Sequence, residues 1–329
     1  MSAEILIERG IGAIRALVID GGTIVAAHVE RDDQSPAAGA VHVARLTKIL
    51  EPGRRGIMRI GDHEGLIEPL PYCPEGGLLR VEVTRAALHE AGRPRLAKLR
   101  NIEGDATSEG EVRGGPDLAA RLAGQGRLVR LSGVGEDRLE AAGWSETVEA
   151  ARSGHVAFAG GLLTISPTPA MTVIDIDGPG DPEVLALAAA GAVAAAIACF
   201  DLQGSIGIDF PTLEGKAARA RIGELLDAAL PAPFERTAVN GWGFVQIVRP
   251  RRRASFVEAV RSPGFAALEL LRRAARSGAG NRTLAAYPAV IAWLERHPAL
   301  VAELARTLGG DIRLQADPAL AMVAGDVHG

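Results

Sequence analysis

Three aspartates at the ends of two apolar segments are the residues best suited to carry out chemistry. Asp175 and Asp177 lie two positions apart in segment 173–177, and Asp209 ends segment 205–209. Side chains of a strand alternate between its two faces, so Asp175 and Asp177 point to the same side. If the two segments are neighbouring strands, three carboxylates meet at one end of a parallel sheet. Like charges this close favour a shared cation, and carboxylate oxygens suit Mg²⁺ or Mn²⁺.

Ordinary structural roles stay open for the same residues. Asp177 precedes Gly178 and fits a turn, whereas Asp209 fits the cap of a following segment. The chain contains no GxxxxGK(S/T), GxSxG or HExxH motif, and its seven histidines are scattered. A cation held by carboxylates is therefore the candidate that remains for a catalytic site.

The cysteines and the first residues predict a reducing, cytoplasmic location. Cys73 and Cys199 lie far apart without a CxxC pattern, so we expect neither a cysteine zinc site nor a disulfide framework. Residues 1–12 carry charges around a short apolar run and lack the basic start and apolar core of a signal peptide.

The segments around the aspartates predict a strand–helix–strand unit with a parallel pair of strands. A strand at 171–176, an alanine-rich helix at 182–200 and a strand at 205–210 form this βαβ pattern. The uncharged stretch 184–200 is shorter than the about 20 residues of a membrane span, so we expect a buried helix and no membrane contact. Apolar spacing predicts further strands at 162–165, 234–239 and 242–248, and helices at 118–124, 139–153 and 216–229.

The remaining sequence predicts two more modules in a chain whose 329 residues allow about two domains and a small third. Strands at 5–7, 14–19 and 23–30 open the chain as antiparallel sheet. Short apolar runs broken by turns predict a small barrel at 39–104. This segment has 11 Lys and Arg against 8 Asp and Glu, a charge of +3 within a chain of −4, which suits contact with a polyanion. Residues 265–329 predict a small α/β domain.

The order of these segments resembles the ribonuclease E/G family over nearly the whole chain. Segments 164–177 and 201–210 resemble the catalytic core of that family, and Gly39 to Ile67 looks like the start of its inserted S1 domain. Arg127 to Gly135 is similar to its 5′-sensor strand, and Gly243 to Arg251 to its basic strand after the catalytic helix.

The resemblance implies an α/β (α+β) fold with three parts. A ribonuclease H-like catalytic domain with a shortened 5′-sensor region would cover 1–38 plus 105–262. An S1-like (OB-fold) RNA-binding barrel would cover 39–104, and a small α/β domain 263–329. The implied activity is that of a Mg²⁺-dependent endoribonuclease that cleaves single-stranded RNA and leaves 5′-phosphate and 3′-hydroxyl ends, in RNA processing or decay.

The resemblance also implies which residues of this chain correspond to the site residues of the family. Asp175 and Asp209 match the two metal-binding, catalytic aspartates, and Asp177 adds a carboxylate where the family usually has Asn. The metal ligands expected are therefore Asp175, Asp177 and Asp209, holding Mg²⁺ or Mn²⁺. The arginines expected to contact RNA are Arg54, Arg55, Arg59, Arg93, Arg95, Arg130, Arg249, Arg251, Arg252 and Arg253.

The sequence also departs from the family pattern. No cysteine follows Arg253, so we expect no zinc and no zinc-linked dimer, and the oligomeric state stays open. Ile57 and Leu66 align with positions where the family stacks RNA on aromatic rings. Leu131 stands where a hydroxyl residue is expected after Arg130, which puts recognition of a 5′-monophosphate in doubt. Gln246 replaces an acid.

Two questions keep more than one answer: the role of the aromatic residues Trp242 and Phe244, and the activity of the protein. The two rings suit base stacking, but apolar alternation in a strand favours core packing. The first hypothesis is that the protein is an endoribonuclease. The second is an RNA-binding protein of the same fold without turnover, and the third is a nuclease acting on DNA.

Overall fold

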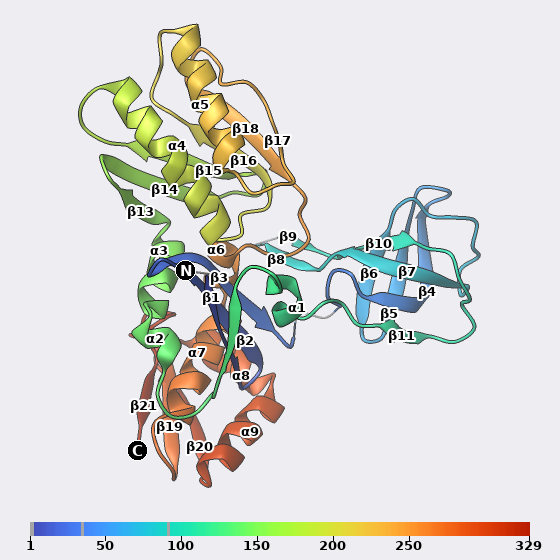
Figure 1. The fold of residues 1–329 in the computed structure, drawn as a ribbon. Coiled ribbons are helices and arrows are strands. Elements are labelled where there is room, and N and C mark those ends of the chain that lie inside the picture. Colours follow the sequence, from blue (N-terminus) through green and yellow to red (C-terminus); the bar gives the residue numbers. More distant parts are fainter. Residues whose placement is uncertain (1–2, 34–35, 91–92) are drawn as a thin grey trace. The chain divides into compact units, whose positions relative to one another are not determined.

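The chain is a mixed α/β protein that forms two compact units (Figure 1). The structure is a computed structural model and describes residues 3–33, 36–90 and 93–329. Unit 1 consists of residues 1–31, 124–248 and 255–329. Unit 2 consists of residues 32–123 and 249–254. The mixed α/β class expected from the sequence is confirmed.

The first strands of unit 1 form a sheet with the order β12-β1-β2-β3. The three strands predicted at the chain start are confirmed, and they pair antiparallel, whereas β12 pairs parallel to β1. The tight turn between β2 and β3 is possible because Gly21 and Gly22 both have positive φ. The strands are β1 (Glu4–Gly10), β2 (Ala13–Asp20), β3 (Thr23–Arg31) and β12 (Arg127–Leu131).

The aspartates lie in a second sheet of unit 1, with the order β13-β14-β15-β16-β18-β17. β15 and β16 are parallel and α4 connects them, which confirms the predicted βαβ unit. β14 pairs antiparallel to β15 and β17 antiparallel to β18, so the sheet is mixed. The strands are β13 (His155–Phe158), β14 (Gly161–Pro167), β15 (Thr172–Asp177), β16 (Gly204–Asp209), β17 (Glu235–Arg236) and β18 (Phe244–Arg249).

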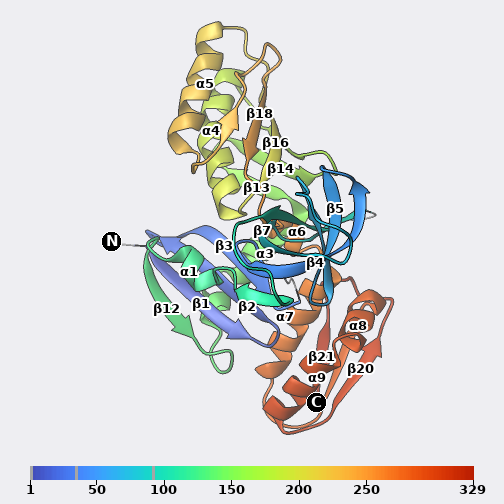
Figure 2. The same cartoon turned by 90° about the vertical axis from the view of Figure 1, so that its right-hand side faces the viewer.

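Two helices cover one face of this sheet, α4 (Pro182–Cys199) and α5 (Lys216–Ala229). Figure 2 shows both on the same side of β14, β16 and β18. The strand residues that pack under them are apolar and buried: Leu163, Ile165, Ile174, Ile176, Ile206, Ile208, Val245 and Ile247. Because side chains alternate, the residues between these positions lie on the opposite face, which neither helix covers.

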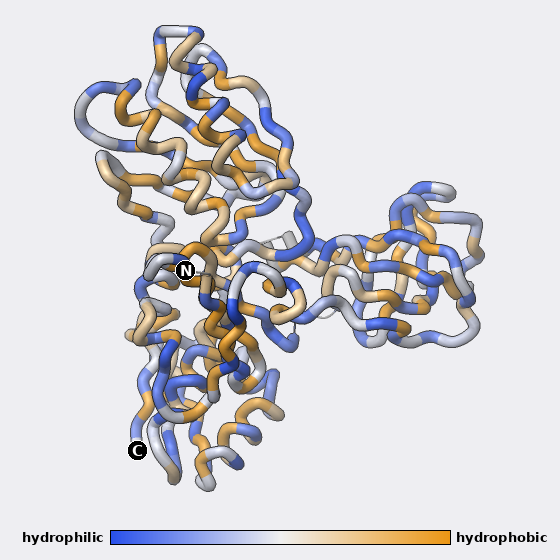
Figure 3. The backbone as a smooth tube through the Cα atoms, viewed as in Figure 1, coloured by the Kyte–Doolittle hydropathy of each residue, from blue (hydrophilic) through white to orange (hydrophobic). Residues whose placement is uncertain are grey.

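Helix α4 is held at its start by Asp181, which accepts hydrogen bonds from the backbone N–H of Glu183 and Val184. Hydrophobic residues dominate its length (Figure 3). It is long and apolar enough to cross a membrane, with 18 residues and a mean hydropathy of 1.9, and 44% of it is buried in the structure. A core helix of a soluble protein passes the same test, and α4 packs against the sheet.

The rest of unit 1 contains short helices and a small sheet with the order β20-β19-β21. The predicted helix at 139–153 is wrong as one element, because Gly143 adopts a positive φ of 105° and separates α2 from α3. A second apolar core lies between the small sheet and α7, α8 and α9. The elements are α2 (Arg138–Ala141), α3 (Trp144–Ser153), α6 (Phe256–Ala259), α7 (Pro263–Ala275), α8 (Pro288–Glu295), α9 (Pro298–Leu308), β19 (Arg282–Ala286), β20 (Ile312–Ala316) and β21 (Asp326–His328).

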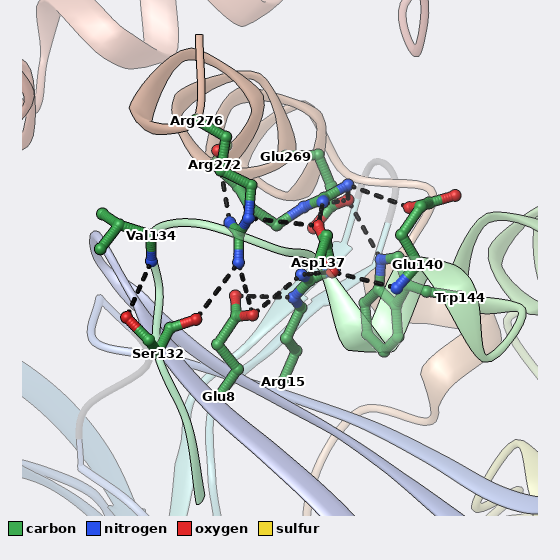
Figure 4. A network of polar contacts seen from close by, with 10 residues as sticks. All are labelled: Glu8, Arg15, Ser132, Val134, Asp137, Glu140, Trp144, Glu269, Arg272 and Arg276. Atoms are coloured by element: carbon green, nitrogen blue, oxygen red, sulfur yellow. Dashed lines mark hydrogen bonds and ion pairs between the residues drawn. The ribbon is translucent and has the colours of Figure 1, made fainter. Parts of the chain in front are cut away.

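A buried ionic network ties the first sheet to α2 and α7 (Figure 4). Arg15 on β2 donates to Glu8 on β1 at 3.1 and 3.2 Å and to Asp137 at 2.6 Å. Arg272 of α7 donates to Asp137, and Arg276, the C-cap residue of α7, donates to Glu8 at 2.6 Å. Glu8 is only 1% exposed. Buried charges of this kind are stable only when all are paired, so the network fixes how these elements dock.

The neighbouring arginines and the burial of Asp137 both affect its pKa. Burial alone raises its pKa, but a hydrogen bond from the backbone N–H of Glu140 and the charges of the three arginines outweigh burial. The resulting pKa lies below the ordinary value of an aspartate.

In the described part of unit 2, strands close a five-stranded barrel with the order β4-β5-β6-β10-β7 and a closing pair β4–β7. The small barrel predicted from the turns is confirmed. β10 is parallel to β6 and the other pairs are antiparallel. Its core is apolar, with Leu46, Met58 and Leu99 fully buried. The strands are β4 (Val41–Glu51), β5 (Arg55–Ile60), β6 (His63–Ile67), β7 (Leu78–Arg85) and β10 (Ala97–Asn101).

Shorter elements complete unit 2. β11 adds to the barrel by pairing with β4, and β8 pairs antiparallel with β9. The backbone N–H of Ala86 donates to the carbonyl of Arg252, which attaches segment 249–254 to this unit. The elements are β8 (Leu88–Glu90), β9 (Arg93–Arg95), β11 (Gly110–Arg113) and α1 (Leu118–Leu122).

Candidate active site

The structure places Asp175 and Asp209 side by side. They are partners in the register of the parallel strands β15 and β16, whose backbones are about 4.8 Å apart. Asp177 follows two residues later on the same face of β15. All three side chains are exposed on the sheet face that the helices leave uncovered. The expectation that the two apolar segments are neighbouring strands is therefore confirmed.

The three carboxylates have no side-chain partner among the described residues, as is also true of other exposed acids such as Asp20 and Glu64. Among the described residues, none forms a hydrogen bond or ion pair with the side chains of Asp175, Asp177 or Asp209. Elsewhere, carboxylates are paired with arginines, as Asp227 is with Arg236 at 2.5 Å. Like charges directly opposite one another in a sheet are unfavourable. Asp175 and Asp209 face each other in register with no basic side chain of the described residues paired to them. Their negative charges are therefore not compensated by the fold.

The donor set fits a hard divalent cation. Such ions take carboxylate oxygens, and Mg²⁺ is bound through one or two carboxylates with water completing its shell. Asp175 and Asp209 supply two carboxylates on adjacent strands, which matches this requirement. Within residues 3–33, 36–90 and 93–329, no group of three or more His, Cys, Asp or Glu side chains is close enough to hold an ion together. Asp177 is therefore the more distant member of the set.

Neighbours on the same sheet face are neutral. Thr164 and Leu162 of β14 lie opposite Asp175 and Asp177. On the other side, Gln246 of β18 donates through Nε2 to Ser205 Oγ at 2.8 Å. Gln246, at a position where the resemblance leads us to expect an acid, thus forms a neutral hydrogen bond between strands. Farther out on this face lie His155, the register partner of Thr164, and Glu235, the register partner of Val248.

Trp242 departs from the prediction of core packing. Its side chain is 78% exposed, and it lies in the turn before β18 rather than in a strand at 242–248. Phe244 opens the strand and is half-buried. The strand predicted at 234–239 is likewise wrong beyond β17. Asn240-Gly241 is a turn signal that alternation in the apolar residues obscured.

Arginines predicted to bind RNA on the barrel are paired with acids. Arg54 lies 2.5 Å from Glu51, and Arg55 3.4 Å from Glu68. Arg59 donates to Glu109 at 3.0 and 3.1 Å.

A second arginine completes this contact. Arg45 Nε donates to Glu109 at 2.5 Å, so one carboxylate holds two guanidinium groups. Hydrogen bonds from Arg59 and Arg45 keep the pKa of Glu109 below its ordinary value. Glu109 could not be predicted as a partner of these arginines, because no local sequence pattern indicates contacts with residues 50 and 64 positions away.

The other predicted arginines are spread over both units. Arg130 is exposed on β12 of unit 1, and Arg95 is half-buried on β9 of unit 2. The side chain of Arg93 lies outside the described residues. The segment that contains Arg249, Arg251, Arg252 and Arg253 belongs to unit 2.

Two aliphatic residues occupy the predicted stacking positions. Ile57 of β5 and Leu66 of β6 are register partners and are both half-buried.

Comparisons of the chain with models of known protein families and with curated proteins give no match.

Proposed function

We propose that this protein is a metal-dependent endoribonuclease that cleaves single-stranded RNA, with Mg²⁺ or Mn²⁺ held by Asp175 and Asp209. The observation that carries the proposal is the in-register, exposed and unpartnered pair of carboxylates on β15 and β16. The resemblance of the surrounding segments to the ribonuclease E/G family supports the same reaction. Products would carry 5′-phosphate and 3′-hydroxyl ends.

Each aspartate has a distinct task in this proposal. Asp175 and Asp209 would hold the cation, and both stand on strands whose other side chains pack into the core. Asp177 adds negative charge beside them, which strengthens cation binding and weakens the polarising effect of the cation. A divalent cation bound there supplies charge stabilisation at the attacked phosphate and a water of lowered pKa. Ser205, four positions before Asp209 on β16, and Gln246 form a neutral hydrogen bond farther along the same sheet.

The finer fold assignment belongs to the same proposal. We assign the barrel as an S1-like OB-fold inserted in a ribonuclease H-like domain, with a small α/β domain at 263–329. The barrel order β4-β5-β6-β10-β7 with β7 returning to β4 supports an OB-fold. In that fold the second and third strands form the oligonucleotide-binding face, which here are β5 and β6. RNA is the proposed partner, and we propose neither a zinc site nor membrane attachment.

Cleavage of a fluorescently labelled single-stranded RNA tests this function directly. Wild type and Asp175→Asn are compared with Mg²⁺, with Mn²⁺ and with EDTA, and single-stranded DNA serves as the second substrate. We expect RNA products that need the cation and disappear in the variant. RNA binding without cleavage under every condition would instead support an RNA-binding protein without turnover. Cleavage of DNA alone would support a DNA nuclease on the same fold.

A separate prediction concerns the barrel. Glu109→Gln removes the carboxylate that holds Arg45 and Arg59, so both guanidinium groups become available to RNA phosphates. We expect tighter RNA binding and a steeper salt dependence, by about 0.7 in the logarithmic slope for each added phosphate contact. Fluorescence anisotropy over a series of KCl concentrations measures both quantities.

The matched control for this variant is Glu64→Gln. It removes the same charge from β6, opposite Arg59, and Glu64 forms no ion pair with any residue that the structure describes. Equal affinities and slopes for the two variants would show that the paired arginines do not contact RNA.

A further inference from the structure

Trp242 stands apart from the other tryptophans of the chain. Trp144 is fully buried and Trp293 is 7% exposed, whereas Trp242 is 78% exposed. Among the described residues, no ring contact or hydrogen bond engages its side chain. A large, rigid aromatic side chain kept in solvent is a typical contact for a ligand that offers a flat face.

The turn that carries Trp242 is held by one side chain. Asn240 Oδ1 accepts hydrogen bonds from the backbone N–H of Trp242 at 2.9 Å and of Phe244 at 3.0 Å. The backbone N–H of Asn240 donates to the carbonyl of Phe244 at 2.9 Å, which closes the turn. Gly243 has a φ of 92°, a conformation that other residues rarely adopt. The backbone on both sides of Trp242 is therefore fixed.

This turn is docked on the strand that carries Asp209. The backbone N–H of Phe210 donates to the carbonyl of Gly243 at 3.3 Å. A Cβ atom at Gly243 would lie 2.1 Å from the carbonyl oxygen of Phe210, so the two backbones touch. Phe210 directly follows Asp209, which places Trp242 at the end of β16 where the carboxylate stands.

The strand order sets the distance between the Trp242 turn and the aspartates. β15, β16 and β18 are consecutive in the sheet, so Asp175 and the Trp242 turn are about two strand spacings, or about 10 Å, apart. Phe244 lies on the same sheet face as the pair, because a Cβ atom at Gly207, two residues before Asp209, would lie 2.8 Å from its ring. A nucleotide adjoining a phosphate at the aspartates is within reach of this surface.

We propose that Trp242 stacks on the base next to the scissile phosphodiester, so that the site accepts an unpaired base and selects single-stranded RNA. The inference rests on the proposed function and deepens it. Stacking uses the flat face that every base has, so it tolerates any base but requires one to be present. Bases in a duplex are stacked on one another and cannot offer that face.

Fluorescence titration and anisotropy test the proposal in the Asp175→Asn protein, with RNA present but not expected to be cleaved. Because the other two tryptophans are buried, quenching by a single-stranded RNA oligomer reports on Trp242. We expect quenching, and we expect it to be lost in Trp242→Phe. Trp242→Ala should weaken binding roughly fivefold to a hundredfold, and Trp242→Phe by less. Tyr287→Ala removes an exposed ring elsewhere in unit 1 and should leave affinity unchanged.

Steady-state cleavage by the proteins with Asp175 intact separates the two proposals. An RNA that lacks one base beside the cleavage position should react more slowly with wild type, and the difference should vanish in Trp242→Ala. Cleavage by wild type with no effect of Trp242→Ala on affinity or rate would overturn the stacking role and leave the nuclease in place. Quenching and weakened binding without cleavage would retain the stacking role and overturn the nuclease. Absence of RNA binding would overturn the stacking role.

Discussion

Asp209→Asn is expected to abolish RNA cleavage while RNA affinity stays equal or rises. The loss follows because an amide cannot replace the carboxylate that faces Asp175 across two parallel strands. Charge stabilisation by a divalent cation contributes several kcal/mol, so the rate should fall on the order of 1,000-fold. Affinity should not fall, because the substitution removes a negative charge that repels the RNA backbone. Single-turnover cleavage and binding in EDTA measure the two effects.

The comparison protein for this experiment is Asp20→Asn. Asp20 is also exposed at a strand end, but it lies in the first sheet and not beside the pair. Its cleavage rate should match wild type. A rate within twofold of wild type in Asp209→Asn would remove Asp209 from the site and, with it, the proposed arrangement of the cation.

Asp137→Asn is expected to cost about 2–3 kcal/mol of unfolding free energy at pH 7, less than the loss of a partner from a fully buried pair. The substitution removes a mostly buried carboxylate that pairs with Arg15 and Arg272. Arg15 then keeps Glu8 as its acidic partner, and Arg272 keeps Glu269. Asn still accepts the hydrogen bond from Glu140 N–H that caps α2, so the effect reports on charge rather than on the cap. Urea denaturation monitored by circular dichroism gives the difference.

The pH dependence of this loss has a defined sign. Because the pKa of Asp137 is lowered on folding, its ionisation stabilises the protein above the unfolded value of about 3.9. That contribution disappears as the pH falls through the lower pKa of the folded state. The difference between wild type and Asp137→Asn should therefore be constant at neutral pH and shrink under strong acid. A difference that persists below the folded pKa would assign the loss to packing.

An exposed pair provides the control for stability. Asp227 lies on α5 and is 53% exposed, and Asp227→Asn breaks its ion pair with Arg236 of β17. Surface pairs contribute at most about 1 kcal/mol, so this variant should remain close to wild type. A loss as large as that of Asp137→Asn would show that burial does not govern the two pairs.

Local patterns were sufficient for the βαβ unit and for the face that carries the aspartates. Period-two alternation placed Asp175 and Asp177 on one side of a strand, and β15 has this form. Alternation failed for Trp242, because an apolar residue in a Gly-rich turn looks the same as one on a buried strand face. The Asn240-Gly241 turn decides the matter, since its backbone hydrogen bonds end the strand at Phe244.

The sequence by itself determined which residues are apolar, where most strands and helices form, and that three aspartates end two strands. Tertiary structure decided which charges far apart in the sequence are paired. Arg15 meets Asp137 across 122 positions, and Arg59 meets Glu109 across 50. An ion pair depends on distance in space, which no local spacing encodes. The same long-range packing brought Asp209 into register with Asp175 while bringing no arginine to either among the described residues, and this difference marks the pair as the candidate site.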